Sequence, residues 1–282
     1  MVKFLIIGFE YDKLEQTSRL PVIRIDIKNF FNWVRKWCSS GDIITDYKIH
    51  KIYKNLDHKY YYCQDRKDTI NAIFSSLSNS KGENKYIIYF TGHGKDKGML
   101  LPDGSIMYFH TLKKVICGMV PPQSEIFVMI DCCHPGRMGL NYVFSKTHFV
   151  FKNEENIEKS SQKFFFLTSF NYQERNIITD RGSLFTNSFL RAIKNLNRSE
   201  IDKKNIQSYI YSKNRNIERF CSKIREFMKY DVRDMKIQSG FVGQEIVFAS
   251  SHNLDPILWL WIGNKNNKDY SFVKSKGRIV IH

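Results

Sequence analysis

Apolar runs of strand length alternate with helical patterns along most of the chain. Four runs, beginning at Phe4, Tyr86, Ile126 and Phe164, are almost continuously apolar. This pattern is typical of strands that are covered on both faces of a mostly parallel sheet. The expected strands are 4–8, 47–53, 86–90, 126–130, 164–167 and 245–248, and the expected helices are 27–37, 68–77, 109–116, 184–196 and 206–228.

The order of these elements predicts an α/β fold, a three-layer α/β/α sandwich around a mostly parallel six-stranded sheet. With 282 residues, the chain is longer than an average domain, but α/β layers of this length often form a single unit. Residues 141–163 are polar and charged, and we expect an exposed linker there. The prediction is therefore one domain at 1–250, divided by this linker, and a tail at 251–282 without an assigned role.

Composition excludes several classes of protein. The 42% of hydrophobic residues can form a substantial core, which excludes disorder as the main state. The longest uncharged apolar stretches, such as 257–262, are far shorter than the roughly 20 residues that cross a bilayer. The N-terminal apolar run is followed at once by Glu10 and Asp12, unlike a signal peptide, and the six cysteines are scattered without C-x-x-C spacing. These features predict a soluble protein of a reducing compartment, the cytoplasm, with no membrane partner.

The charge raises nucleic acid as a partner, because 44 Lys and Arg face 28 Asp and Glu, for a net charge of +16. However, the chain has no block of five or six consecutive basic residues. Abundant Lys, Asn, Ile, Phe and Tyr, as an AT-rich coding sequence produces, spread over surface loops, explain the charge better. We therefore expect no nucleic-acid partner.

Two of the predicted strands end in residues that carry chemistry. The strand 86–90 runs into Thr91-Gly92-His93-Gly94, and the strand 126–130 runs into Asp131, Cys132, Cys133 and a Pro-Gly breaker. Ligands of open parallel sheets bind beyond the carboxyl ends of the strands. A lone His or Cys is most often structural, but a His and a Cys at one sheet edge suit a thiol nucleophile with an imidazole acid or base.

Two further interpretations concern the same strand ends. Gly94 lacks a side chain, so its N–H can approach a substrate carbonyl and form an oxyanion hole with the N–H of Cys133. The alternative is a zinc site of His93, Cys132, Cys133 and His134. Adjacent cysteines project to opposite sides of an extended chain, which disfavours a shared tetrahedral metal. We predict no metal and no cofactor.

Residues 89–94 and 131–136 resemble the catalytic His and Cys motifs of the caspase, metacaspase and paracaspase group of cysteine peptidases, with the metacaspase form most similar. The resemblance covers about residues 3–250 and makes 1–140 similar to a large subunit and 164–250 to a small subunit. It implies that Cys133 is the nucleophile, that His93 is its partner, and that Cys132 is a bystander. Further matches are the first strand at 4–8, Asp26 at the start of the first helix, and 165–169, 173–174 and 182–186 in the small-subunit part.

The acidic residues suggest the specificity. Asp131 lies two residues before Cys133, so on an extended strand its side chain points the same way, toward the pocket for the residue that precedes the cut. Asp26 and Thr91 match the metacaspase pocket, and the resemblance then implies cleavage after Arg or Lys. Against this, Arg19 and Arg175 lie near positions where caspases carry pocket arginines, so a protease that cuts after Asp is the alternative.

Other properties stay open or are expected to be absent. The aspartates of the metacaspase calcium site are missing at 106–110 and at Leu140, so we expect no calcium requirement. Pro135 replaces the usual Ser after the motif, which leaves an inactive caspase-like regulator of peptidases or death-pathway proteins as an alternative of another class. The resemblance allows a monomer or a caspase-type homodimer, a role in cell death or protein processing, and self-cleavage at Lys146, Lys152, Lys159 or Lys163.

Overall fold

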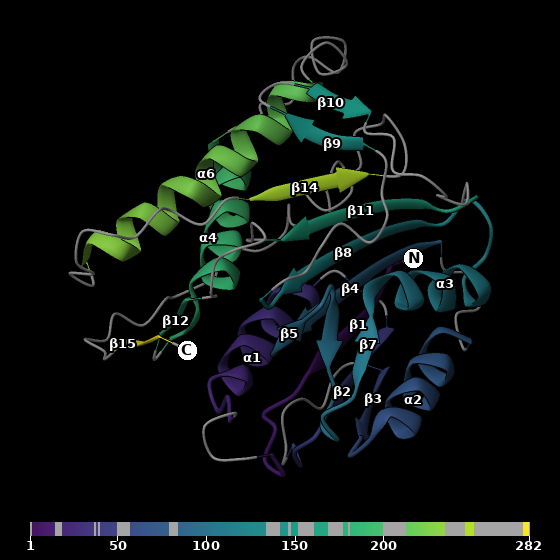
Figure 1. Cartoon of the computed structure of the whole chain (residues 1–282). Coiled ribbons are helices and arrows are strands. Elements are labelled where there is room, and N and C mark those ends of the chain that lie inside the picture. Colours follow the sequence, from purple (N-terminus) through teal and green to yellow (C-terminus); the bar gives the residue numbers. More distant parts are fainter. Residues whose placement is uncertain are drawn as a thin grey trace.

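A large mixed sheet forms the middle layer of the protein in a computed structural model (Figure 1). The structure describes residues 2–14, 19–36, 38, 40–49, 57–78, 84–133, 142–145, 148–151, 161–168, 177–179, 181–199, 213–234, 246–250 and 279–281. Six neighbouring strands of the sheet run parallel: β3 (Asp57–Tyr62), β2 (Ser40–Thr45), β1 (Val2–Gly8), β4 (Lys85–Thr91), β8 (Glu125–Asp131) and β11 (Lys163–Thr168). Three antiparallel strands extend it beyond β11: β14 (Val247–Ser250), β9 (Tyr142–Ser145) and β10 (His148–Phe151).

Helices cover both faces of this sheet. Helices α1 (Ile23–Val34), α4 (Leu184–Ser199) and α6 (Lys213–Asp234) pack on one face, and α2 (Arg66–Ser78) and α3 (Phe109–Met119) pack on the other (Figure 1). The predicted α/β/α sandwich with a mostly parallel sheet is therefore confirmed. The sheet has nine strands instead of the six expected, six of them parallel, and β3 was not among the expected strands. Two small sheets lie beside it, one of β5 (Gly94–Lys95), β6 (Gly98–Leu100) and β7 (Ile106–Tyr108), the other of β12 (Ile177–Thr179), β13 (Gly182–Ser183) and β15 (Ile279–Ile281).

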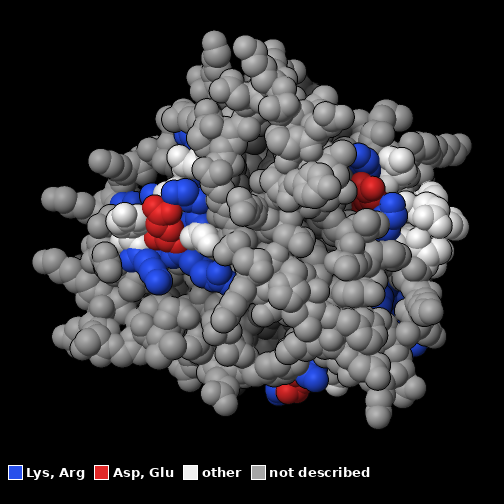
Figure 2. All heavy atoms as spheres, turned by 90° about the horizontal axis from the view of Figure 1, so that it is seen from above, with Lys and Arg blue, Asp and Glu red and all other residues white. Residues whose placement is uncertain are grey.

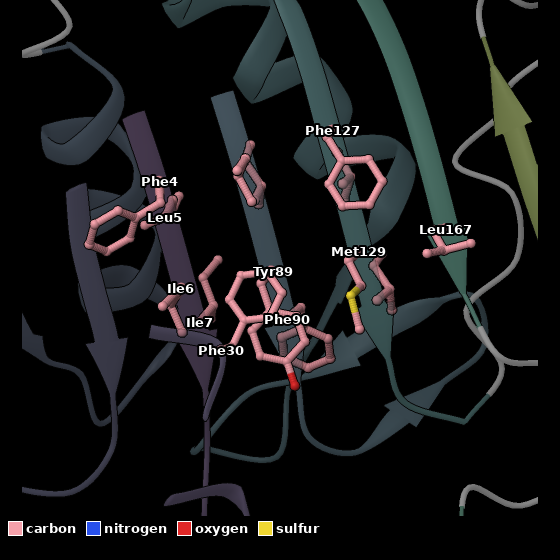
Figure 3. Packing of buried hydrophobic residues seen from close by; sticks show 14 of the residues in the cluster. Phe4, Leu5, Ile6, Ile7, Phe30, Tyr89, Phe90, Phe127, Met129 and Leu167 are labelled. Atoms are coloured by element: carbon pink, nitrogen blue, oxygen red, sulfur yellow. The ribbon is translucent and has the colours of Figure 1, made fainter. Parts of the chain in front are cut away.

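The central strands are buried because both of their faces are covered. After their first residues, every residue of β1, β4 and β8 is buried. Figure 3 shows how side chains of these strands and of β11 pack with Phe30 of α1. The ring of Phe30 stacks on Tyr89 with 4.0 Å between centroids, a specific contact beyond the burial of apolar surface. These apolar layers hold the strand ends in fixed positions.

The second strand was predicted wrongly. The apolar pattern indicated 47–53, but β2 ends at Thr45, residues 46–49 lie in no strand, and 50–53 lie outside the described residues. The polar residues of β2, such as Asp42, interrupt the apolar pattern that predicts a strand. Asp42 is nevertheless buried, because its carboxylate accepts the Lys59 N–H (3.0 Å) and lies 3.8 Å from Lys3 Nζ. A buried charge is tolerated when it is paired and hydrogen-bonded in this way.

Three boundaries also differ from the predictions. The range 141–163 is not all linker, because it contains β9 and β10, which pair with each other, and β9 also pairs with β14. The last expected strand, 245–248, begins at Val247, and Glu245 is outside the described residues. The expected helix 206–228 begins in the described chain at Lys213. Within the tail 251–282, only 279–281 are described, as β15. No helix in the described part of the chain is long and apolar enough to cross a membrane.

Candidate active site

His93 and Cys133 follow the ends of two adjacent parallel strands. In the ladder between β4 and β8, Thr91 is the register partner of Asp131, and the Gly92 N–H donates to the Asp131 carbonyl oxygen (3.3 Å). His93 and Cys133 each lie two residues beyond this last pair, and both side chains are half-buried. The structure thus places at one sheet edge the two residues that the sequence placed at two strand ends.

The positions on both sides of His93 require glycine, each for its own steric reason. A Cβ atom at Gly94 would overlap the carbonyl oxygen of Cys133 and lie 2.6 Å from Cys132 Sγ. Gly92 has φ +154°, and a Cβ there would lie 2.6 Å from Tyr11 Oη. Only glycine permits backbone contacts this close. Gly94 therefore lies directly against the backbone of Cys133, the other expected oxyanion donor.

The two neighbouring cysteines have different environments. Cys132 is fully buried, and burial raises the pKa of its thiol well above the ordinary value, with Cys133 and Asp131 adding to the effect. Cys133 is half-buried, so part of its surface is open. Because the thiolate is the nucleophilic form of cysteine, Cys132 is poorly suited to attack a substrate.

Tyr11 contacts His93 from the loop after β1, and no sequence motif singles it out. Its phenol oxygen accepts the His93 backbone N–H (2.8 Å) and donates to the Leu100 carbonyl oxygen (3.0 Å). The phenol and imidazole ring centroids are 4.8 Å apart. The Leu100 N–H also donates to the His93 carbonyl oxygen (3.0 Å), so both backbone polar groups of His93 are held. The only available signal was the position of Tyr11 after a strand that ends at this sheet edge.

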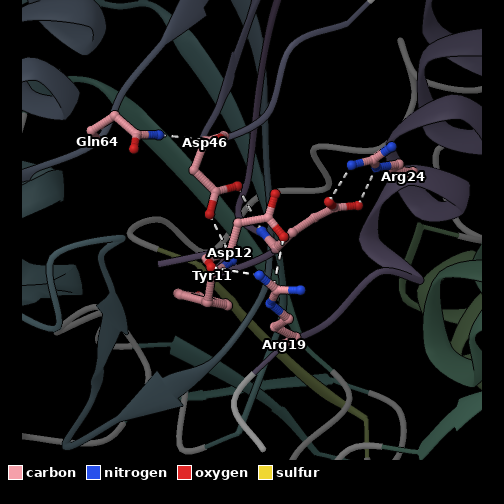
Figure 4. Close-up of polar contacts among 7 residues, drawn as sticks. Tyr11, Asp12, Arg19, Arg24, Asp46 and Gln64 are labelled. Carbon is pink, nitrogen blue, oxygen red and sulfur yellow. Dashed lines mark hydrogen bonds and ion pairs between the residues drawn. The ribbon is translucent and has the colours of Figure 1, made fainter. Parts of the chain in front are cut away.

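A polar cluster behind Tyr11 holds this loop in place (Figure 4). The carboxylate of Asp46 accepts the backbone N–H groups of Glu10 (2.7 Å) and Tyr11 (2.6 Å), and the Asp46 carbonyl oxygen accepts from Gln64 Nε2 (3.0 Å). The buried carboxylate of Glu10 forms a two-pronged ion pair with Arg24, in which Arg24 Nη2 donates over 2.6 Å. Such paired, charge-assisted bonds are stronger and more specific than neutral ones.

The three predicted pocket residues are also close together, but they are enclosed. Asp26 Oδ2 accepts from Thr91 Oγ1 (3.4 Å), Asp26 Oδ1 accepts the Ser183 N–H (2.8 Å), and Asp131 accepts from the hydroxyl of Thr186. Asp26 is 0% exposed and Asp131 is 1% exposed. Burial, and next the neighbouring Asp131, raises the pKa of Asp26 well above the ordinary value. A substrate cation reaches these carboxylates only if the covering residues move.

Ser183 and Thr186 hydrogen-bond Asp26 and Asp131, and no sequence pattern predicted these two partners individually. They belong to the segment 182–186, whose resemblance to a small-subunit helix start was noted without roles for single residues. The structure shows why the segment starts a helix here: Phe185 N–H donates to Ser183 Oγ (3.2 Å), and the Thr186 hydroxyl also bonds Tyr89 Oη (2.7 Å). A side-chain cap and a cross-link to β4 fix this turn over Asp26.

The remaining predicted residues are paired with other groups or are not described. Arg19 donates to the Asp12 carbonyl oxygen (2.9 Å) and lies 3.8 Å from the Asp12 carboxylate, with both side chains about half exposed. Arg175, His134, Pro135 and Leu140 lie outside the described residues, as do Lys146, Lys152 and Lys159. Lys163 begins β11, and its Nζ lies 3.9 Å from Glu125.

Metal ligands and surface charge add little to this site. Within the described ranges, no group of three or more His, Cys, Asp or Glu side chains is arranged to hold a metal ion. On the face shown in Figure 2, the described Lys and Arg side chains lie beside acidic ones in separate groups.

Comparisons with known proteins agree with the architecture. No family model matches the sequence, and no curated protein sequence is similar to it. Among solved structures, a protein from Geobacter sulfurreducens is similar with a TM-score of 0.50 and 14% identity, over 90% of this chain and 95% of that one. The structure of pro-sf-caspase-1 has a TM-score of 0.50 and 11% identity, over 89% and 91%. Caspase-1 from Spodoptera frugiperda has a TM-score of 0.47 and 10% identity, over 88% and 85%. At such identities a likeness shows the fold alone, and the fold of this chain is the caspase-like α/β/α sandwich.

Proposed function

We propose that the protein is a cysteine endopeptidase that uses Cys133 as nucleophile and His93 as acid and base. The observation that supports this most is the meeting of His93, Gly94 and Cys133 beyond Thr91 and Asp131, at the edge of a caspase-like sheet. The contrast between half-buried Cys133 and fully buried Cys132 supports the choice of the thiol.

The mechanism follows from these positions. His93 takes the proton of the Cys133 thiol, and the sulfur attacks the scissile carbonyl carbon to form a tetrahedral intermediate, whose oxyanion is held by the N–H groups of Cys133 and Gly94. His93 gives a proton to the leaving amine as the C–N bond breaks, which leaves an acyl-enzyme. His93 then takes a proton from water, and the hydroxide attacks the thioester carbonyl carbon. The C–S bond breaks, the peptide acid is released, and His93 returns its proton to the Cys133 sulfur. No cofactor is needed.

The proposed specificity is cleavage after Arg or Lys. A guanidinium or ammonium group between Asp26 and Asp131 would be paired with two carboxylates, and Thr91 adds a hydroxyl. In the unliganded protein, Ser183 and Thr186 hold these carboxylates, so the turn at Gly182–Ser183 has to shift when a basic side chain enters. The site of Arg19, on Asp12, favours this specificity over cleavage after Asp.

The enclosure of both pocket carboxylates favours a second candidate function. If the covering turn never opens, the protein is a caspase-like module that binds peptidases or death-pathway proteins without cutting them. The biological setting of the first candidate is cell death or protein processing, as a monomer or a caspase-type homodimer.

The test is hydrolysis of fluorogenic peptides that end in Arg, Lys or Asp. We expect release after Arg and Lys, loss of activity in Cys133→Ala, and retention of activity in the matched control Cys132→Ala, which removes the neighbouring buried thiol. Activity that survives Cys133→Ala contradicts the assigned nucleophile. Cleavage only after Asp contradicts the specificity. Full-length protein that cuts none of the peptides, whereas it captures an active peptidase, supports the second candidate.

A further inference from the structure

Tyr11 is held on several sides at the sheet edge where His93 and Cys133 lie. It is fully buried, and its backbone has φ +61°, a left-handed conformation that is uncommon for a residue with a side chain. The carboxylate of Asp46 holds this conformation by accepting the Tyr11 N–H (2.6 Å) and the Glu10 N–H (2.7 Å) (Figure 4). An uncommon backbone held by a buried carboxylate points to a role for the side chain that it presents.

That side chain is directed at His93. The phenol oxygen accepts the His93 backbone N–H (2.8 Å), and the phenol ring lies against the imidazole, with 4.8 Å between centroids. The same hydroxyl donates to the Leu100 carbonyl oxygen (3.0 Å) in β6, so it joins the β1 loop, the His93 loop and the small sheet β5-β6-β7. The phenol also fills the space beside Gly92, because a Cβ atom there would lie 2.6 Å from the phenol oxygen.

We propose that Tyr11 is a positioning residue for His93, a role that rests on the function proposed above. His93 has to serve the thiol, the leaving amine and water from one place, and its loop leaves the sheet at a glycine with φ +154°. Without an anchor, such a loop moves the imidazole by enough to slow catalysis, because misplacement by about 1 Å costs about 100-fold in rate. The phenol fixes the main chain of His93, and the ring contact limits the orientation of its side chain.

The hydroxyl remains a donor over the working pH range. Burial raises the pKa of Tyr11 well above the ordinary tyrosine value, so the phenol stays protonated. The charged or titratable groups that influence this pKa are Asp46 and Cys132, beside the hydrogen bond from His93. The hydrogen bonds of the Tyr11 phenol therefore do not depend on pH in this range. If a mutation of Tyr11 changes the pH dependence of catalysis, the change arises in the His93–Cys133 pair.

The test compares Tyr11→Phe with Tyr47→Phe. Tyr11→Phe keeps the ring and removes both hydroxyl bonds. Tyr47 is another buried tyrosine at this sheet edge, but its ring lies under Arg24 (4.7 Å to the guanidinium carbon), so its variant is the matched control. We expect Tyr11→Phe to lower kcat about 10- to 100-fold with little change in KM, and Tyr47→Phe to change neither by more than about twofold.

A second measurement separates this inference from the proposed function. The rate of Cys133 alkylation by iodoacetamide against pH reports on the thiol–imidazole pair without a substrate. We expect the alkylation profile to shift in Tyr11→Phe and to stay unchanged in Tyr47→Phe. Wild-type protein without peptidase activity overturns the proposed function, whereas an unchanged kcat and an unchanged profile in Tyr11→Phe overturn only the role of Tyr11.

Asp46→Asn covers the case in which Tyr11→Phe does not fold. The amide keeps the shape of the carboxylate but has one acceptor oxygen, so one of the Glu10 and Tyr11 N–H groups loses its acceptor. A smaller fall in kcat, about 3- to 10-fold, with the same direction of shift in the alkylation profile, supports the inference. Wild-type kcat and an unshifted profile in Asp46→Asn contradict it.

Discussion

The two sides of the candidate site are constructed differently. On the catalytic side, the backbone of His93 is held at its N–H by Tyr11 and at its carbonyl by Leu100. On the specificity side, Asp26 and Asp131 are enclosed together, and burial and the neighbouring carboxylate raise the pKa of Asp26. Under the proposed mechanism, His93 has to keep one position. In contrast, a cation that enters between Asp26 and Asp131 would stabilise their charged forms. Under the proposed function, we therefore expect substrate binding to move the turn over Asp26 and Asp131 and to leave His93 and Cys133 in place.

The largest effect is expected on the fixed side, from Gly94→Ala. The added methyl group would overlap the Cys133 carbonyl oxygen, so the His93 and Cys133 loops must separate. We expect kcat/KM to fall by about 100-fold or more. The matched control is Gly118→Ala in α3, where a Cβ meets nothing within 4 Å. This control should keep full activity and raise the free energy of unfolding by up to about 1 kcal/mol. A Gly94→Ala enzyme with wild-type kcat/KM would show that the close contact is not needed.

A smaller effect is expected on the specificity side, from Asp131→Asn. Loss of one carboxylate should lower kcat/KM for peptides ending in Arg or Lys by about 10- to 100-fold, the range for a hydrogen bond to a charged group. The loss should appear mainly in KM, because the dyad is untouched. Asp96→Asn, at an exposed aspartate on the loop between β5 and β6, is the control. Equal losses for basic and uncharged peptides would mean that Asp131 supports the fold rather than the specificity.

The smallest effect is on stability, through the proton on Asp26. A raised pKa means that the folded protein holds a proton which the unfolded chain releases above the ordinary value of 3.8. The stability from this group is therefore full below that value and is lost as the pH rises toward the raised pKa of Asp26. One proton gives a slope of at most about 1.4 kcal/mol per pH unit.

Chemical denaturation at several pH values measures this slope. Asp26→Asn should flatten the curve relative to the wild type, and Asp96→Asn should leave it unchanged. A wild-type curve that rises with pH in this window, or an Asp26→Asn curve of the same shape as the wild type, would contradict the protonated state of Asp26.

Much of the fold was predictable because parallel strands that are buried on both faces have almost continuously apolar sequences. The strands β1, β4, β8 and β11 were expected almost at their observed bounds, and their order along the chain gave the layers. Strand β2 was missed because its polar Asp42 is compensated by partners from β1 and β3, which no local pattern reveals. The hairpin of β9 and β10 was read as linker, since short edge strands stabilised by pairing carry weak signals.

The sequence by itself determined the chemistry at the two strand ends: a His between two glycines, and a Cys two residues after an Asp. Strand direction then implied that they meet, because the carboxyl ends of parallel strands share one edge. Only the tertiary structure decided what surrounds them. The anchor Tyr11, its support by Asp46 and the enclosure of Asp26 by Ser183 join residues far apart in the chain. Contacts of this kind depend on packing between distant elements, so they leave no local pattern in the sequence.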